Sequence, residues 1–304
     1  MHSGYILAID RVNEIRGVMK EVDMTKHHPS RRQCLRAIGA ATVSTLALGT
    51  PVMRAASGSP SSLSTEDLIR VLGRSDGGIS ARWTDGVLTA HVDSKTTPLF
   101  RVLSQIFARH RRRADGIFDV VVFELAYFTD LQHRELLETW RNPFTDVTVT
   151  VPKTILGPTP YRITADQRVE RELRFSGGVP FDHRFSLDTS GGDLWVTESL
   201  DSVMPAPAPG VPGFGFHENF IYHTSVASLD DSSQPCVGAQ VQKINVLSWR
   251  PWMLMGDVRG VTMTRAHGRV IDDLARLPDA FKRLNAAHSD GLLDDLESVL
   301  RFAD

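Results

Sequence analysis

From Gly73 to about Ala266 the chain is a succession of short segments rich in Val, Ile, Phe and Thr, separated by turn residues about every ten to fifteen positions. Segments of this length and composition are typical of β-strands, and their even spacing favours antiparallel neighbours joined by short connections. We therefore expect a mainly β fold, either an antiparallel barrel or a strongly curved sheet. A closed barrel would hide its strand edges and leave an interior for a small molecule. The expected strands cover residues 99–108, 118–128, 135–140, 147–151, 161–175, 184–187, 194–200, 219–229, 239–248 and 260–265.

Helices are expected only at the two ends of this strand-rich region. Ser64 can cap a short helix together with Asp67, and that helix would end at Gly73. At the C-terminus, residues 278–287 and 292–302 predict two helices, the second with its leucines on one face. Such helices would cover an end or an edge of the sheet.

Three stretches predict turns or loops. Asp85-Gly86 lies between two apolar runs, which is the strongest short signal for a β-hairpin. The basic run 109–113 predicts a charged loop between strands, with binding of a phosphate or an acidic partner as the alternative. The Pro- and Gly-rich run 203–216 cannot be a central strand, and we interpret it as a long loop that acts as a lid.

The first 56 residues have the features of an export signal. Arg31 and Arg32 form a twin-arginine pair, a weakly apolar run follows at 37–52, and small residues at 55–57 suit signal-peptidase cleavage. The acidic residues before the arginines are unusual for a leader, so we expect translation to start at Met24. The apolar run is shorter than a membrane span needs, so no stable span is expected in the mature chain.

This signal predicts the organisation and location of the protein. We expect the twin-arginine translocase as the partner during export, a periplasmic or secreted location, and one β-rich domain over residues 57–304 with helices at its C-terminus. About 250 residues are enough for one domain with a substantial hydrophobic core.

The composition of residues 57–304 excludes several classes of function. With 26 basic and 32 acidic side chains, this part has a formal charge of −6, which argues against nucleic-acid binding. Cys236 is its single cysteine, so no intramolecular disulfide is expected, and a buried, unreactive thiol is the simplest interpretation. The sequence contains no dinucleotide fingerprint, phosphate-binding loop or nucleophile elbow, and we expect no cofactor.

Two motifs resemble a known family. The first runs from Leu137 to Thr145 and contains Trp-Arg-Asn-Pro, followed by a strand-like stretch. The second runs from Trp249 to Gly256 and reads Trp-Arg-Pro-Trp-Met-Leu-Met-Gly. Together they resemble an exported bacterial family catalogued as domain of unknown function 1838, over about residue 73 to the C-terminus. Asp146 departs from the family pattern, in which we expect Gly, and this weakens the prediction of a tight turn there. The resemblance implies an exported, β-rich domain and no particular activity.

Four residues are candidates for acid–base chemistry. Glu124 lies in an apolar strand, where burial would raise the pKa of its carboxyl group, and Tyr127 follows in the same strand. His217 and His223 would share one face of a strand, about 20 Å apart along it, too far for one metal ion. We therefore expect no metal site. The alternative interpretations are a solvated or ion-paired Glu124 and histidines that are simple polar wall residues.

Aromatic residues are candidates for ligand binding or, alternatively, for core packing. The first hypothesis is a barrel that binds a small apolar or aromatic compound in its cavity. The second is a cofactor-independent lyase, isomerase or hydrolase that uses Glu124 or Tyr127 with His217 or His223 in the same cavity. A surface interaction without any cavity is the third. The candidate ligand-binding residues are Trp140, Asn142, Phe220, Tyr222, Trp249 and Trp252.

Overall fold

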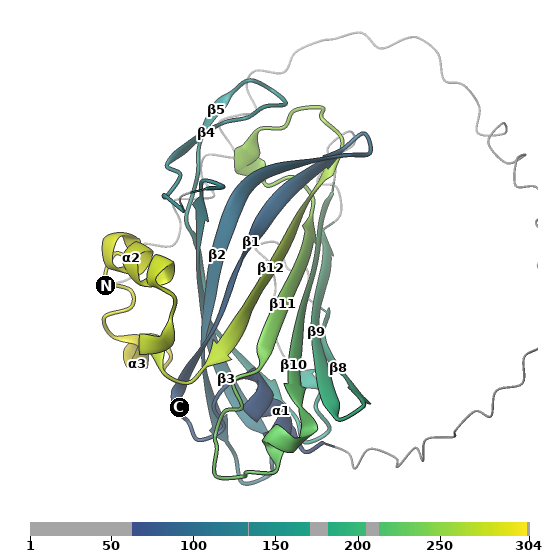
Figure 1. The fold of residues 1–304 in the computed structure, drawn as a ribbon, viewed down its shortest axis with the longest axis vertical. Helices are drawn as coiled ribbons and strands as arrows, with labels where there is room; N and C mark the ends of the chain where they lie inside the picture. Colours follow the sequence, from purple (N-terminus) through teal and green to yellow (C-terminus); the bar gives the residue numbers. More distant parts are fainter. Residues whose placement is uncertain (1–62, 133, 171–181, 205–212, 303–304) are drawn as a thin grey trace, which may run out of the picture. The chain divides into compact units, whose positions relative to one another are not determined.

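A computed structural model describes residues 63–132, 134–170, 182–204 and 213–302, all within one compact unit, 58–304. In this part of the chain ten strands form one antiparallel sheet, which curls into a nearly closed barrel (Figure 1). The strand order is β7-β6-β3-β2-β1-β12-β11-β10-β9-β8. The strands are β1 (Ile79–Val92), β2 (Lys95–Arg112), β3 (Phe118–Thr129), β6 (Thr154–Ile163), β7 (Val169–Glu170), β8 (Asp182–Ser190), β9 (Asp193–Met204), β10 (Phe214–Ser225), β11 (Gln240–Leu247) and β12 (Val261–Ile271).

The two ends of the sheet approach each other. The ring of Tyr161 on β6 lies 5.4 Å from the ring of His183 on β8. Two glycines allow a close approach between β1 and β12: a Cβ atom on Gly86 would lie 2.1 Å from the carbonyl oxygen of Arg265, and one on Gly268 would lie 1.7 Å from that of Trp83. Glycine in a strand commonly marks such a site of backbone contact. The predicted mainly β barrel or strongly curved sheet, with a short N-terminal helix and two C-terminal helices, is confirmed.

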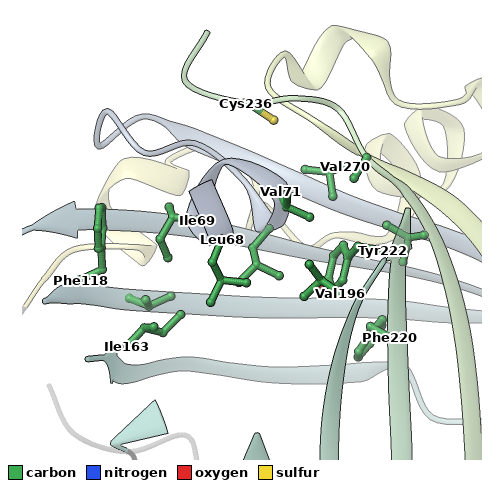
Figure 2. Close-up of a cluster of buried hydrophobic side chains, with 14 of the residues drawn as sticks. Leu68, Ile69, Val71, Phe118, Ile163, Val196, Phe220, Tyr222, Cys236 and Val270 are labelled. Carbon is green, nitrogen blue, oxygen red and sulfur yellow. The ribbon is translucent and has the colours of Figure 1, made fainter. Parts of the chain in front are cut away.

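Helix α1 (Thr65–Leu72) closes one end of the interior. The expected capping box forms, because the Ser64 hydroxyl accepts from the backbone N–H of Asp67, whose carboxylate accepts from the backbone N–H of Ser64. The helix ends at Gly73, as predicted. Its buried residues pack against apolar side chains from both walls of the sheet (Figure 2). Each fully buried Leu or Ile contributes about 1.5–3 kcal/mol. This apolar core includes Leu68, Ile69, Val71, Phe118, Ile163, Val196, Phe220, Tyr222, Cys236 and Val270.

Helices α2 (Asp279–His288) and α3 (Leu296–Val299) cover the outer face of β1–β3 (Figure 1). Phe281 packs on Trp83, with ring centroids 5.7 Å apart. Asn285 accepts hydrogen bonds from Tyr127 (3.1 Å) and Gln105 (2.5 Å). Only four residues of the predicted 292–302 helix are helical; most of the rest forms turns. The 3₁₀ turn η5 (Leu274–Arg276) links β12 to this outer layer.

The predicted hairpin turn at Asp85-Gly86 is wrong. Strand β1 runs straight through these two residues, and the chain reverses at Asp93 and Ser94, which have φ values of 46° and 63°. Glycine is needed at position 86 for the contact with β12. This contact places an Asp-Gly pair, which is the usual sequence of a hairpin turn, inside a strand.

The predicted basic loop is also wrong, because Arg109–Arg112 belongs to β2. Because successive side chains of a strand point to opposite faces, the side chains of this basic run do not form one surface. His110 is buried, whereas Arg109 bonds to Glu297 (2.6 Å) and Arg112 to Glu66 (2.6 Å). The run is thus used for ion pairs within the protein. Most of the predicted lid, 205–212, lies outside the described residues, as do 171–181.

The Trp-Arg-Asn-Pro motif forms a separate hairpin of β4 (Thr139–Arg141) and β5 (Thr148–Thr150). Asp146 takes the left-handed conformation (φ 60°) that glycine would favour, and its carboxylate pairs with Arg141 at 2.7 Å. The tight turn therefore forms despite the missing glycine, since aspartate tolerates this conformation better than most residues.

Candidate functional site: a polar layer inside the sheet

The interior of the sheet contains charged side chains above the apolar core around α1. Because alternate residues of a strand share a face, each strand sends single polar residues inward between apolar ones. On β10, for example, Glu218 points inward with Phe220 and Tyr222. The inward polar side chains that bond to one another through charged groups are Arg82, Ser104, Glu124, His183, Glu198, Glu218, Lys243 and Asn245. They form two groups, one on each side of the Phe220 ring.

The first group, here called the closed group, is centred on Glu198 of β9. Its carboxylate forms an ion pair with Arg82 at 2.5 Å and hydrogen bonds with His183 Nε2 (2.9 Å) and the Tyr222 hydroxyl (2.7 Å). Burial opposes ionisation of Glu198, but the charge of Arg82 and the hydrogen bond from His183 outweigh it and lower its pKa to about 2. Arg82 reaches across the interior from β1, and its guanidinium carbon lies 3.6 Å from the centre of the Phe220 ring.

The second group, here called the open group, is centred on Lys243 of β11. Its Nζ lies 3.0 Å from Glu218 on β10 and 3.7 Å from Glu124 on β3, so it also spans the interior. The Ser104 hydroxyl donates to Glu124 at 2.9 Å, and Asn245 Nδ2 donates to Glu218 at 2.8 Å. These bonds satisfy the carboxylates less completely than those around Glu198.

A small cavity of about 20 Å³ lies beside the closed group, bordered by residues that include Arg82, Glu198 and His110. It has room for about one water molecule. Two of its lining residues carry a buried atom without a partner in the described structure, Arg82 Nε and His110 Nδ1. Burial lowers the pKa of His110 to about 4, so this imidazole is neutral at neutral pH and its Nδ1 can accept a hydrogen bond from water.

An aromatic cap lies at the end of the interior opposite α1. It joins the β4–β5 hairpin to η4 (Pro251–Met253), in the connection between β11 and β12. Buried Asn142 holds the two together, because its Nδ2 donates to the Met253 carbonyl at 2.8 Å and its Oδ1 accepts from the Phe144 N–H. The rings contact one another, which makes Trp140, Trp249 and Trp252 part of the cap's own packing. The cap consists of Phe100, Phe128, Trp140, Phe144, Trp249 and Trp252.

The candidate acid–base residues do not meet. Glu124 points into the interior, while Tyr127 of the same strand points outward under α2, where burial raises the pKa of its hydroxyl group. His217 and His223 lie on the outer face of β10, opposite to Glu218, and bond to Asp201 and Asp193. Lys243 is therefore the cationic partner of Glu124.

A larger hollow of about 340 Å³ lies at the ends of β9, β10, β11 and β12, at the same end of the sheet as the aromatic cap. His217 is on its wall. The imidazole Nδ1 bonds to Asp201, and Nε2 accepts from Asn219 Nδ2 at 2.9 Å, so both nitrogens are occupied. The other lining residues are mostly apolar or small. The full lining is Asp201, Ser202, Val203, Gly215, Phe216, His217, Val246, Leu247, Ser248 and Val261.

Comparison with known proteins adds no family. No family model matches the sequence, and no curated protein matches it significantly. The resemblance to domain of unknown function 1838 therefore stays a prediction. Among the described helices, none is long and apolar enough to cross a bilayer. Within the same residues, no three His, Cys, Asp or Glu side chains gather in a way that could hold a metal ion.

Proposed function

We propose that the protein binds a small apolar or aromatic compound in the 340 Å³ hollow at the capped end of the sheet. The observation that carries this proposal is the size and character of the hollow. Small-molecule sites typically enclose about 300–1,000 Å³ and combine apolar walls with a few polar groups that orient the ligand. Here Val203, Val246 and Val261 supply apolar wall, and the Ser248 hydroxyl supplies a polar group.

The geometry supports recognition rather than proton transfer. A general base needs a nitrogen that can reach the substrate proton. In His217 one nitrogen is held by Asp201 and the other by Asn219, whose own Oδ1 accepts from Ser199 at 2.7 Å. The alternative enzyme would pair Glu124 or Tyr127 with His217 or His223. Glu124 points into the interior and both histidines lie on the outer face of β10, while the Tyr127 hydroxyl donates to Asn285 under α2.

Two matched tryptophan substitutions test the proposal. Val261 lines the hollow, and Val226 lies beyond the other end of β10; both are 37 % exposed. The uncharged fluorophore N-phenyl-1-naphthylamine is the probe, titrated into the purified chain. We expect saturable binding that Val261→Trp weakens at least tenfold by filling the hollow, a difference of about 1.4 kcal/mol, and that Val226→Trp leaves unchanged. Equal affinities in both variants, or no saturable binding by the original chain, would overturn the proposal.

We propose further that the chain is exported in folded form by the twin-arginine translocase. Support comes from Arg31 and Arg32 ahead of an apolar run. Replacing both by lysine should abolish appearance of the processed protein in the periplasmic fraction, whereas Arg36→Lys should not. Unchanged export of the double variant would refute the proposal.

A further inference from the structure

The hollow at the ends of β9–β12 is bordered by four described side chains that form hydrogen bonds, and three of them are already engaged. Asp201 has a partner on each oxygen, because Oδ2 lies 2.8 Å from Arg184 Nη2 and Oδ1 is bonded to His217. Both nitrogens of His217 are occupied. Ser202 is buried and has an interaction of its own. These three side chains are therefore used by the protein itself.

Ser248, the fourth of these side chains, has an unused hydroxyl proton. The residue directly follows β11, and its backbone N–H donates to the Gly215 carbonyl at 3.0 Å. The backbone N–H of Gly215 donates in return to Ser248 Oγ at 2.9 Å, so the position of Oγ at the hollow is fixed. A hydroxyl group can also donate one hydrogen bond. Within the described chain Oγ forms no second hydrogen bond, so its proton is available to a ligand.

The wall around this hydroxyl group is apolar. Val246 lies two residues before Ser248, so strand alternation places both side chains on the same face, and Val203 and Val261 border the same hollow. Ser248 itself is half-buried. An apolar ligand that covers this wall displaces water from the hydroxyl group, and the hydrogen bond to that water is lost unless the ligand replaces it. The hollow thus offers one hydrogen-bond donor within an apolar surface.

We propose that the compound bound in the hollow carries a carbonyl oxygen, as in an aromatic ketone, and that Ser248 selects it. This step rests on the function proposed for the same hollow. The Ser248 hydroxyl donates to the ligand carbonyl, while Val203 and Val261 contact the hydrocarbon part. A hydrocarbon of the same shape leaves the hydroxyl proton without an acceptor once water is displaced, and a covered donor without a partner is costly. Ser248 is therefore the specificity-determining residue of the hollow.

The ketone 2-acetylnaphthalene and the hydrocarbon 2-ethylnaphthalene are suitable probes, because they are alike in size and only the first has a carbonyl oxygen. The affinity of each is measured by its displacement of N-phenyl-1-naphthylamine from the purified chain. Ser248→Ala should weaken binding of the ketone about fivefold, the effect of one hydrogen bond, and leave binding of the hydrocarbon unchanged. Ser186→Ala, at an exposed serine of β8 outside the lining of the hollow, is the matched control and should alter neither affinity.

The role of Ser248 and the role of the hollow fail in different ways. Equal weakening of both naphthalenes in Ser248→Ala, or unchanged binding of the ketone, would overturn the selection of a carbonyl group and leave the hollow as a binding site. Val261→Trp should weaken both naphthalenes, and if it weakens neither, the hollow is not the site and both proposals are refuted. Thermal unfolding of Ser248→Ala should match that of the original chain, which shows that a loss of binding is not a loss of the fold.

Discussion

The closed and open groups stand on either side of the same ring, Phe220, and differ in how many partners their carboxylates have. In the closed group, Glu198 receives a guanidinium, an imidazole and a phenol hydroxyl. In the open group, one lysine, Lys243, forms ion pairs with both carboxylates. Asn245 Oδ1 has no hydrogen-bond partner among the described residues. The Arg82–Glu198 and Lys243–Glu124 ion pairs cross the interior and connect strands that are not neighbours in the sheet, whereas the Lys243–Glu218 pair joins the adjacent strands β11 and β10.

This difference indicates that the closed and open groups contribute differently to the stability of the fold. A buried ion pair contributes to the fold only when its remaining hydrogen bonds are satisfied, because desolvation otherwise outweighs the attraction. The Glu198 carboxylate meets that condition, although Arg82 Nε has no partner among the described residues, and Glu198 lies next to the apolar core at the α1 end. The open group meets it only in part, and it lies toward the aromatic cap. We therefore regard the closed group as the larger contributor to stability and the open group as the part of the layer that tolerates substitution better.

The largest expected effect comes from breaking the closed group. Arg82→Met leaves the buried Glu198 carboxylate without its main counter-charge, so the free energy of unfolding should fall by about 3–5 kcal/mol. Urea denaturation at pH 7 measures the loss. Arg184→Met, which removes an exposed ion pair with Asp201, is the control and should cost less than about 1 kcal/mol. A loss in Arg82→Met as small as in this control would show that the closed group is not structural.

The next effect is a pH dependence that originates beside the closed group. The pKa of His110 is about 4 in the folded chain and 6.5 for an ordinary histidine. Between these values the unfolded chain binds the extra proton, so stability falls as the pH is lowered from 6.5 to 4, by about 3 kcal/mol. Glu198, with a folded pKa of about 2 against 4.5, contributes a further loss only below pH 4.5.

Urea denaturation of the original chain and of His110→Gln at pH 7 and pH 5 isolates this contribution. The variant should lose most of the stability change between the two pH values, since glutamine does not titrate. His91→Gln, the same substitution at a partly exposed histidine on β1, is the control for the chemical change itself. An unaltered slope in His110→Gln would contradict a neutral, buried His110.

The sequence predicts those parts of the fold that depend on neighbouring residues. The helix between Ser64 and Gly73 is confirmed because capping and termination act within one turn. The signal at Gly86 misleads because the reason for glycine there is a contact with β12, nearly 180 residues later. The Trp-Arg-Asn-Pro turn is recognisable in the sequence because it depends on neighbouring residues. The length of β2 is not recognisable, because it depends on contacts with distant parts of the chain.

The polar layer is harder to predict than the strands that carry it. Strand β11 has apolar residues at both alternations, with Val241 and Leu247 inward and Ile244 and Val246 outward, so its sequence does not say which face Lys243 occupies. Glu124 is identifiable as a charge in an apolar strand, but its partner comes from β11 and not from a histidine. Arg250 lies inside a recognised motif, yet only the packing of the cap shows that its side chain has no partner.

The smallest of these effects comes from the open group and sharpens the comparison most. Lys243→Met removes the cation shared by Glu124 and Glu218, but Glu124 retains Ser104 and some contact with solvent, and Glu218 retains Asn245. We therefore expect a loss of about 1–3 kcal/mol, roughly that of a buried polar group deprived of one partner and smaller than for Arg82→Met. Lys153→Met, which breaks a surface pair with Asp290, is the matched control in urea denaturation. If Lys243→Met costs as much as Arg82→Met, the open group contributes as much to the stability of the fold as the closed one, and the difference in carboxylate partners has no energetic consequence.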